Sequence, residues 1–262
     1  MAGPRRRLDE EMVVRGLAET RSRSRALILA NDVLVNGQVV SRAGAPVVAS
    51  DAIDLNAKPR FVSRGGEKLA HALERFGVEP RGCVAADLGA STGGFTDCLL
   101  QGGAVRVYAV DVGYGQLAER LRTDDRVVVM DRTNARALER LPELVDLVTI
   151  DVSFISLRLV LPTAARLLRP RGRCLPLIKP QFEAGRRDVG KNGVVRDPVV
   201  HRRVLRDVLT TAGDNGFAVL GLVRSPLLGP AGNVEFLAHL DLGRAARPMD
   251  EMIEAVVDEA AA

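Results

Sequence analysis

Apolar runs and helical patterns alternate along most of the chain after residue 80. Seven runs are suited to buried strands: Cys83–Leu88, Val105–Asp111, Arg126–Met130, Val145–Asp151, Arg173–Lys179, Phe217–Arg224 and Val234–Leu240. Helical patterns lie between most of them, notably Phe154–Leu168 and Val199–Asn215. This alternation predicts a doubly wound, largely parallel α/β sheet. The last two runs are joined without a helix, so we expect an antiparallel hairpin at the sheet edge.

The first sixty residues show a different pattern, which predicts a small α+β unit. Two short helices are expected, around Asp9–Leu17 and Ser22–Asn31. Asn36-Gly37 then separates the apolar triplet Val33-Leu34-Val35 from the apolar pair Val39-Val40, and this dipeptide favours a tight hairpin. Pro59 discourages helix and marks a linker before a helix at Glu67–Phe76. The expected organisation is a small domain at 1–59, a linker at 60–64, an α/β domain at 65–245, and an acidic tail at 246–262, either disordered or a short helix.

Composition limits the class of protein. The chain is 47% hydrophobic, enough for a sizeable core, yet it contains no apolar segment of about eighteen residues that could span a membrane. The N-terminus runs into acids rather than a signal core, and the three cysteines lack CxxC spacing. We therefore expect a cytoplasmic protein with free thiols. Its formal net charge of +4 permits a polyanionic partner without proving one.

A glycine-rich turn follows the first strand of the predicted sheet. It reads Asp87-Leu88-Gly89-Ala90-Ser91-Thr92-Gly93-Gly94-Phe95-Thr96 and opens a helix, the position where open α/β sheets bind ligands. The glycine order is G-x-x-x-G-G and not the dinucleotide fingerprint G-x-G-x-x-G. This spacing argues against the hypothesis that the protein is a nicotinamide-dependent oxidoreductase. Asp111 and Asp131 end the next two strands. Each could be a solvated strand end, but three acids around a glycine turn favour a cofactor site.

A second group of polar residues ends the fourth and fifth strands. Asp151 and Lys179 lie at the tips of apolar runs, on the same expected sheet edge as the glycine turn. Residues 181–197, directly after Lys179, are glycine-rich and basic. They form either a flexible, solvated loop or, as we favour, a loop that grips substrate phosphates through four cations, Arg186, Arg187, Lys191 and Arg196. No His/Cys cluster has ligand spacing, so no metal is expected.

The segment RSRSRALILANDVLVNGQVV resembles the S4 RNA-binding domain, in which a basic second helix precedes a hairpin. Such domains bind structured RNA through phosphates and shape. The resemblance implies RNA contacts by Arg21, Ser22, Arg23 and Arg25; from spacing alone a solvated helix start is equally plausible. Arg5, Arg6 and Arg64 are further basic candidates for RNA binding.

The motif D-x-G-x-x-x-G-G-F resembles the S-adenosylmethionine motif of the FtsJ-like 2′-O-methyltransferases. This resemblance implies a Rossmann-like class I methyltransferase with a doubly wound seven-stranded sheet. Asp111 is then expected to meet the cofactor ribose and Asp131 the adenine edge. The full set of expected cofactor residues is Asp87, Gly89, Ser91, Gly93, Gly94, Phe95, Asp111, Val112 and Asp131.

Lys68, Asp151, Lys179 and Glu235 match the Lys-Asp-Lys-Glu tetrad of the same enzymes in order and context. A ribose hydroxyl is a weak nucleophile until its proton is withdrawn, so the protein must supply a base and alignment. The resemblance implies that Lys179 contacts the hydroxyl and accepts or stabilises its proton. The two carboxylates would orient the lysines.

Over nearly its whole length the chain resembles the TlyA family of ribosomal RNA 2′-O-methyltransferases. The S4-like segment, V-S-R-G-G-E-K-L, D-L-G-A-S-T-G-G-F-T, D-V-S-F-I-S-L, K-P-Q-F-E and K-x-G-V-V-R-D occur together in this order. The resemblance implies methylation of cytidine ribose in 16S and, in some members, 23S ribosomal RNA, with ribosomal subunits as partners and no obligate protein partner.

Two alternatives stay open. Family members have been labelled haemolysins, which would make the protein membrane-active, yet the sequence has no strongly amphipathic basic helix outside the S4-like region. A catalytically silent ribosome-assembly factor would be expected to show a broken tetrad or glycine turn, and both are intact here.

Overall fold

The computed structural model of the chain divides into two compact units, residues 1–60 and 61–262. The structure describes residues 5–29, 31–55, 59–185, 187–244 and 248–261. Each unit has a core of its own and is described by itself.

The N-terminal unit is a small α+β domain. Its elements are β1 (Arg6–Arg7), α1 (Leu8–Val14), α2 (Arg21–Leu29), β2 (Val33–Val35), β3 (Gln38–Val39), β4 (Pro46–Val47) and β5 (Ile53–Leu55). The strands form a three-stranded sheet, β3-β2-β5, and a pair, β1-β4. Leu8, Met12 and Ile28 of the two helices pack on Val33 of the sheet. Asn36 and Gly37 both have positive φ, at 52° and 78°, as the turn of the predicted hairpin requires.

The second unit contains the predicted seven-stranded sheet. Its strands are β6 (Val84–Leu88), β7 (Arg106–Val110), β8 (Val127–Met130), β9 (Val145–Ile150), β10 (Leu168–Ile178), β11 (Phe217–Arg224) and β12 (Phe236–Leu242). The order is β11-β12-β10-β9-β6-β7-β8. Strands β6 to β10 pair in parallel, whereas β12 runs antiparallel to β10 and β11. The expected antiparallel hairpin is therefore confirmed, with β11 at the edge.

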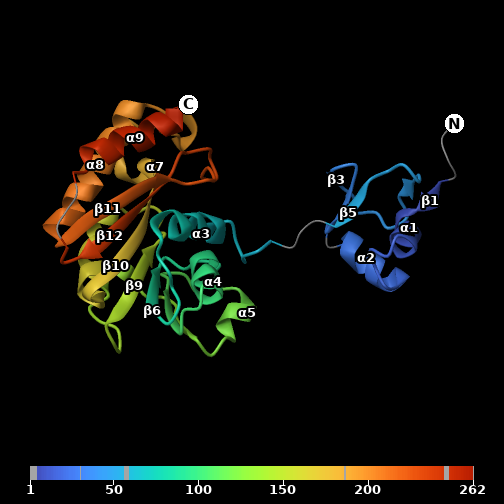
Figure 1. Cartoon of the computed structure of the whole chain (residues 1–262), viewed down its shortest axis with the longest axis horizontal. Helices are drawn as coiled ribbons and strands as arrows, with labels where there is room; N and C mark the ends of the chain where they lie inside the picture. The colour runs from blue at the N-terminus through green and yellow to red at the C-terminus, as the bar shows by residue number, and fades with distance from the viewer. Residues whose placement is uncertain (1–4, 30, 56–58, 186, 245–247, 262) are drawn as a thin grey trace. The chain divides into compact units, whose positions relative to one another are not determined.

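Helices cover both faces of this sheet (Figure 1). They are α3 (Gly65–Phe76), α4 (Gly94–Gln101) and α5 (Glu119–Arg122) on one face, and α6 (Leu161–Leu167), α8 (Pro198–Asp214) and α9 (Asp250–Ala261) on the other, with the short α7 (Pro180–Glu183) after β10. Strand side chains alternate between the two cores, so that Ala85 packs under α3 and α4 whereas Ala86 faces the opposite layer. Cys83, Cys98 and Cys174 are buried, and none of the three is in a disulfide, as expected.

Both ends of the predicted α/β domain need correction. Phe61 is buried in the core under α3, and the amide of Val62 donates to Asp97 of α4 at 2.8 Å, so most of the expected linker 60–64 packs with the second unit. At the other end, the expected acidic tail contains α9, a helix docked on the core. Its apolar stripe, Ile253, Val256 and Val257, is buried. The acids lie on its outer face, where three of them, Asp250, Glu254 and Asp258, pair with arginines of α8.

The predicted helix over Phe154–Leu168 is shorter than expected. A turn of 3-10 helix covers Leu157–Leu159, and α6 begins only at Leu161, with Pro162 in its first turn. Phe154 and its neighbours instead form a loop at the end of β9. Among the described residues, no helix is both long enough and apolar enough to cross a bilayer.

Candidate active site

The carboxyl ends of the parallel strands open into two adjoining pockets. One, of about 560 Å³, lies among the glycine turn, the start of α3, the end of β10 and the segment before β12. The other, of about 410 Å³, lies toward the end of β7. Gly89, Ser91, Asp151, Ser153 and Phe154 line both. These volumes are in the range of small-molecule and cofactor sites, and the position is where open α/β sheets bind ligands.

The glycine turn between β6 and α4 requires its glycines for backbone reasons. Gly89 has φ +90°, and a Cβ there would lie 2.7 Å from the carbonyl oxygen of Asp151. Gly93 has φ +97°, and its Cβ would overlap Leu121 of α5. A side chain at either position would push the turn away from β9 or α5. The turn can therefore keep its backbone close to the pockets only with glycine here.

Asp111 fixes the turn to the end of β7. One carboxylate oxygen accepts from the amide of Ser91 at 2.8 Å, and the other accepts from the amide of Gly113 at 2.7 Å. Asp111 and the exposed Val112 line the second pocket, Gly94 and Phe95 line the first, and Gly89 and Ser91 line both. These six expected cofactor residues therefore lie around the two adjoining pockets.

The three other expected cofactor residues lie away from that space, since Asp87, Gly93 and Asp131 line neither pocket. Asp87 is fully buried behind the turn and accepts from the hydroxyls of Thr96 at 2.7 Å and Thr149 at 3.1 Å. Burial raises the pKa of this carboxyl to about 7. Asp131 is held by the amide of Gly115 and by Arg122, which lower its pKa. Asp87 thus joins α4 to β9. The role of Asp131 at the adenine edge stays a prediction.

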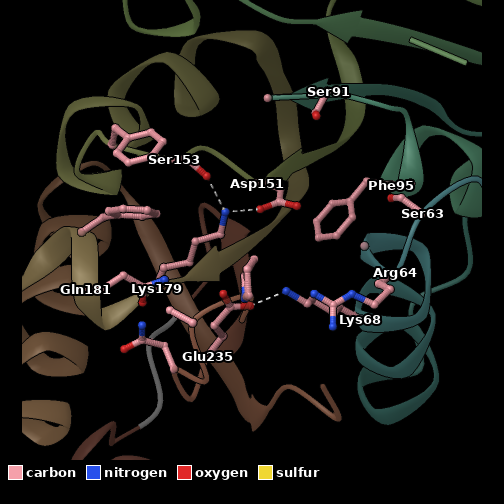
Figure 2. A pocket seen from close by; sticks show the side chains of 18 of the residues that line it. Ser63, Arg64, Lys68, Ser91, Phe95, Asp151, Ser153, Lys179, Gln181 and Glu235 are labelled. Carbon is pink, nitrogen blue, oxygen red and sulfur yellow. Dashed lines mark hydrogen bonds and ion pairs between the residues drawn. The ribbon is translucent and has the colours of Figure 1, made fainter. Parts of the chain in front are cut away.

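The four tetrad residues line the larger pocket as two ion pairs. Figure 2 shows Lys179 pointing toward Asp151 and Ser153, and Lys68 pointing toward Glu235. Lys179 Nζ lies 2.6 Å from Asp151 Oδ1 and donates to Ser153 Oγ at 3.0 Å. Lys68 Nζ pairs with Glu235 Oε2, and both side chains are nearly buried, at 9% and 1% exposure. The structure therefore brings together four residues that lie up to 167 positions apart in the chain.

Phe154 is a site residue that the sequence reasoning missed. Its side chain is 91% exposed, it lines both pockets, and it has φ +64°, which is strained for a bulky residue. Its ring packs on Phe182 with centroids 5.0 Å apart. Glu183 holds the same loop by accepting from Ser156 Oγ at 2.6 Å and from the amide of Leu157 at 2.7 Å. The loop thus presents an aromatic face beside Lys179.

The expected phosphate-gripping loop is described in part. Arg186 and the side chain of Lys191 lie outside the described residues, whereas Arg187 and Arg196 are exposed. The end of the loop reaches the pocket through Asn192 and Gly193. Asn233, another residue that was missed, fixes it there: its side chain accepts from the amide of Val195 at 2.9 Å and donates to the carbonyl of Gly193 at 2.9 Å. Arg64 is exposed at the pocket wall.

In the N-terminal unit, two of the expected RNA-binding arginines converge. Arg21 and Arg25 both donate to Asp9, which is buried, and Arg7 does the same from β1. Arg5, Arg6, Ser22 and Arg23 are exposed, and Arg6 pairs with Glu11 at 3.4 Å. Neither Asp9 nor Arg7 was a candidate from sequence.

The seven-stranded sheet, the glycine turn and the lysine–carboxylate pairs define the chain as a methyltransferase of the FtsJ-like class. The FtsJ-like methyltransferase family matches residues 61–242, and the S4 domain matches residues 6–53. A relative that is 42% identical over nearly the whole chain is named TlyA, and the chain belongs to this family.

Three similarities illustrate the relationship. The chain is 42% identical over 263 residues to the 16S/23S rRNA (cytidine-2′-O)-methyltransferase TlyA of Mycobacterium tuberculosis, covering 97% of this chain and 98% of that protein. It is 46% identical over 271 residues to a Bacillus subtilis protein, YqxC, named as a candidate rRNA methyltransferase, with coverage of 99% and 95%. A solved Streptococcus thermophilus structure, described as a candidate hemolysin, is 43% identical with a TM-score of 0.76 and coverage of 99% and 96%.

Proposed function

We propose that the protein transfers a methyl group from S-adenosylmethionine to the 2′-hydroxyl of a cytidine ribose in ribosomal RNA. The observation that carries the proposal is the pair of lysine–carboxylate contacts across one pocket, directly beside the glycine turn. The name of the Mycobacterium tuberculosis relative supports 16S and 23S rRNA as the substrates.

The residues around the two pockets fit S-adenosylmethionine. The second pocket combines Asp111, whose position is fixed by two backbone amides, with apolar side chains that include Val112 and Ile155. A carboxylate beside an apolar wall suits a nucleoside, and the open glycine turn suits close backbone approach. We expect Gly89, Ser91, Gly94, Phe95, Asp111 and Val112 to hold the cofactor. When bound, it supplies a methyl group already activated by the positive sulfonium.

The chemistry left to the protein is alignment and proton removal. Lys179 Nζ lies at the pocket wall with its donors directed to Asp151 and Ser153, so the amine is fixed in orientation before substrate arrives. In our proposal its amine contacts the ribose hydroxyl: as a neutral amine it accepts the hydroxyl proton while the oxygen takes the methyl group, and as an ammonium it stabilises the negative charge that develops on that oxygen. Lys68 and Glu235 form the opposite, buried side of the pocket and keep its charge balanced. Fixing the hydroxyl between these walls supplies much of the remaining acceleration.

RNA is held, in this proposal, at three places. The exposed face of Phe154 offers a stacking surface for a base next to Lys179, since every base has a π-face and stacking on aromatic rings is common in RNA recognition. Arg64 at the pocket wall, with Arg187 and Arg196 in the 181–197 loop, supplies phosphate contacts. The basic second helix of the N-terminal unit, α2, supplies further phosphate contacts.

The test uses radiolabelled S-adenosylmethionine and separate small and large ribosomal subunits that lack the modification, with wild type and Lys179→Ala side by side. Label on a ribose 2′-oxygen that disappears with the variant supports the proposal and identifies the subunit. If the wild-type protein binds subunits but labels neither subunits nor naked rRNA, the proposal is wrong and the hypothesis of a catalytically silent assembly factor is favoured. Release of dye from lipid vesicles, by wild type and Lys179→Ala alike, would instead favour the haemolysin reading.

A further inference from the structure

Three arginines of the N-terminal unit converge on one buried carboxylate, that of Asp9. Oδ1 accepts from Arg7 Nε at 2.9 Å, and Oδ2 accepts from the Nε atoms of Arg21 and Arg25, each at 3.0 Å. Arg7 also donates Nη2 to Oδ2, at 3.2 Å. The Asp9 side chain has no exposed surface, whereas those of Arg7, Arg21 and Arg25 are 46%, 46% and 52% exposed. One carboxylate at the start of α1 therefore ties β1 to the first turns of α2.

The contacts with Asp9 and Glu10 use only some of the N–H donors of these arginines. A guanidinium carries five N–H donors in a planar fork, and only the inner edge of each fork is spent on Asp9. Arg25 Nη1 and Nη2 have no further partner in the part of the chain that the structure describes. Arg21 gives one nitrogen to Glu10, at 3.0 Å. The cluster is thus a set of three cations held by one carboxylate, in which each arginine, Arg25 most of all, keeps N–H donors for a further anion.

We propose that Asp9 is a positioning residue that holds Arg7, Arg21 and Arg25 as one preformed phosphate-binding face for RNA. This inference rests on the proposed RNA substrate. A mobile arginine side chain loses rotamer freedom when it binds RNA, and this loss of conformational entropy weakens binding. An arginine that Asp9 already holds in place has less of this entropy to lose. The hydrogen bond from Arg7, with those from Arg21 and Arg25, keeps the pKa of Asp9 below its ordinary value, so the carboxylate stays charged at neutral pH.

Charge alone makes the opposite prediction. Removing an acid from a basic surface raises its positive charge, and affinity for polyanions should rise. Glu10 provides the matched control, because it is the next residue, contacts Arg21 and Arg7, and is partly exposed rather than buried. Asp9→Asn and Glu10→Gln make the same change in charge, so a difference in the sign of their effects reports on positioning.

The experiment measures binding of the full-length protein to naked 16S and 23S rRNA by filter binding over a series of KCl concentrations, together with methylation rates against RNA concentration. We expect Asp9→Asn to weaken binding about 10-fold and to make the salt dependence shallower by one to two phosphate contacts. We expect Glu10→Gln to bind at least as tightly as wild type. The methylation rate at saturating RNA should stay within about twofold of wild type, with the loss appearing in KM.

A second variant separates positioning from folding. Arg25→Lys keeps the charge but removes the Nε donor and the fork, and it leaves Asp9 paired with Arg7 and Arg21; we expect binding to fall several-fold. Binding of Asp9→Asn or Arg25→Lys that equals or exceeds wild type would overturn the proposal, and Arg25→Lys alone decides if circular dichroism shows that Asp9→Asn does not fold. Failure of wild type itself to bind or methylate rRNA would instead overturn the proposed function.

Discussion

The catalytic pocket and the N-terminal arginine cluster both place carboxylates against cations, but in opposite arrangements. In the pocket each carboxylate meets one lysine, Lys68 with Glu235 and Lys179 with Asp151. In the N-terminal unit a single carboxylate, Asp9, gathers three arginines. An ammonium is a compact charge that can give up its proton, whereas a guanidinium stays charged and presents a fork that matches phosphate. The lysine–carboxylate pairs therefore suit proton transfer, and the arginine cluster suits RNA binding. Substitutions in the pocket should lower the rate of methyl transfer, whereas substitutions in the cluster should lower the affinity for RNA.

The largest effect is expected for Lys179→Ala. Loss of a positioned acid–base group costs about 10²- to 10⁴-fold in rate, so the single-turnover rate of methyl transfer should fall by that factor. Binding of S-adenosylhomocysteine, measured by calorimetry, should stay within about threefold, because the expected cofactor residues are untouched. If the variant keeps a third or more of the wild-type rate, Lys179 has no acid–base role. It would then only bind RNA, as the arginines of the N-terminal unit are proposed to do.

The two lysine pairs should differ in their contribution to stability. Glu235→Gln leaves Lys68 buried without its counter-charge, and breaking a buried pair in this way costs about 3–5 kcal/mol in the free energy of unfolding. Asp151→Asn should cost less than about 2 kcal/mol, because the Lys179 pair is nearer to solvent. Urea denaturation of both variants measures the difference. Equal losses would mean that the two sides of the pocket are electrostatically alike.

Asp87 extends the comparison to a buried carboxylate that meets hydroxyls instead of a cation. Its pKa is raised to about 7 in the folded protein, mainly by burial, from an ordinary value near 3.8. Between these values the unfolded chain is ionised while the folded protein keeps the proton. The contribution of Asp87 to stability is therefore fully present below about pH 4 and is lost as pH rises to about 7, by up to about 4 kcal/mol.

Asp87→Asn removes this titration while keeping the shape of the side chain. The stability of the variant relative to wild type should therefore increase from pH 4 to pH 8, as measured by urea denaturation at several pH values. Asp9→Asn is the matched case of opposite sign: the pKa of Asp9 is lowered, so wild type gains stability from that carboxylate as pH rises above its folded value. A difference between Asp87→Asn and wild type that does not change with pH would contradict the assignment.

Local patterns predicted most of the fold. The hairpin at Asn36-Gly37 and the seven strands follow from turn chemistry and from apolar runs, which act over a few residues. Helix α9 was missed as part of the domain because its acids dominate the composition, although Ile253, Val256 and Val257 have helical spacing. The four tetrad residues came from family resemblance, since no local signal links Lys68 to Glu235 across 167 positions.

The remaining site features depend on tertiary packing. Asp87 and Asp111 both end or nearly end a strand, and only the fold decides that one is buried behind the turn while the other lines a pocket. Asp9 lies in an ordinary amphipathic helix, and its role appears only when α2 brings Arg21 and Arg25 to it. An aromatic residue after a strand suggests a core position, yet Phe154 is turned outward by a positive φ.

Phe154 gives the smallest effect and the sharpest test of whether the pocket also takes part in holding RNA. Stacking of one base on an aromatic ring contributes about 1–3 kcal/mol, so Phe154→Ala should raise KM for the ribosomal subunit about 5- to 150-fold, with a smaller change in kcat. Phe154→Tyr should stay near wild type, and Phe154→Leu should fall between, because leucine keeps apolar area but has no π-face. Tyr114→Ala is the control, since Tyr114 is an exposed aromatic residue that lines neither pocket. If leucine performs as well as phenylalanine, the ring acts as a hydrophobic wall, and RNA affinity lies with the arginines alone.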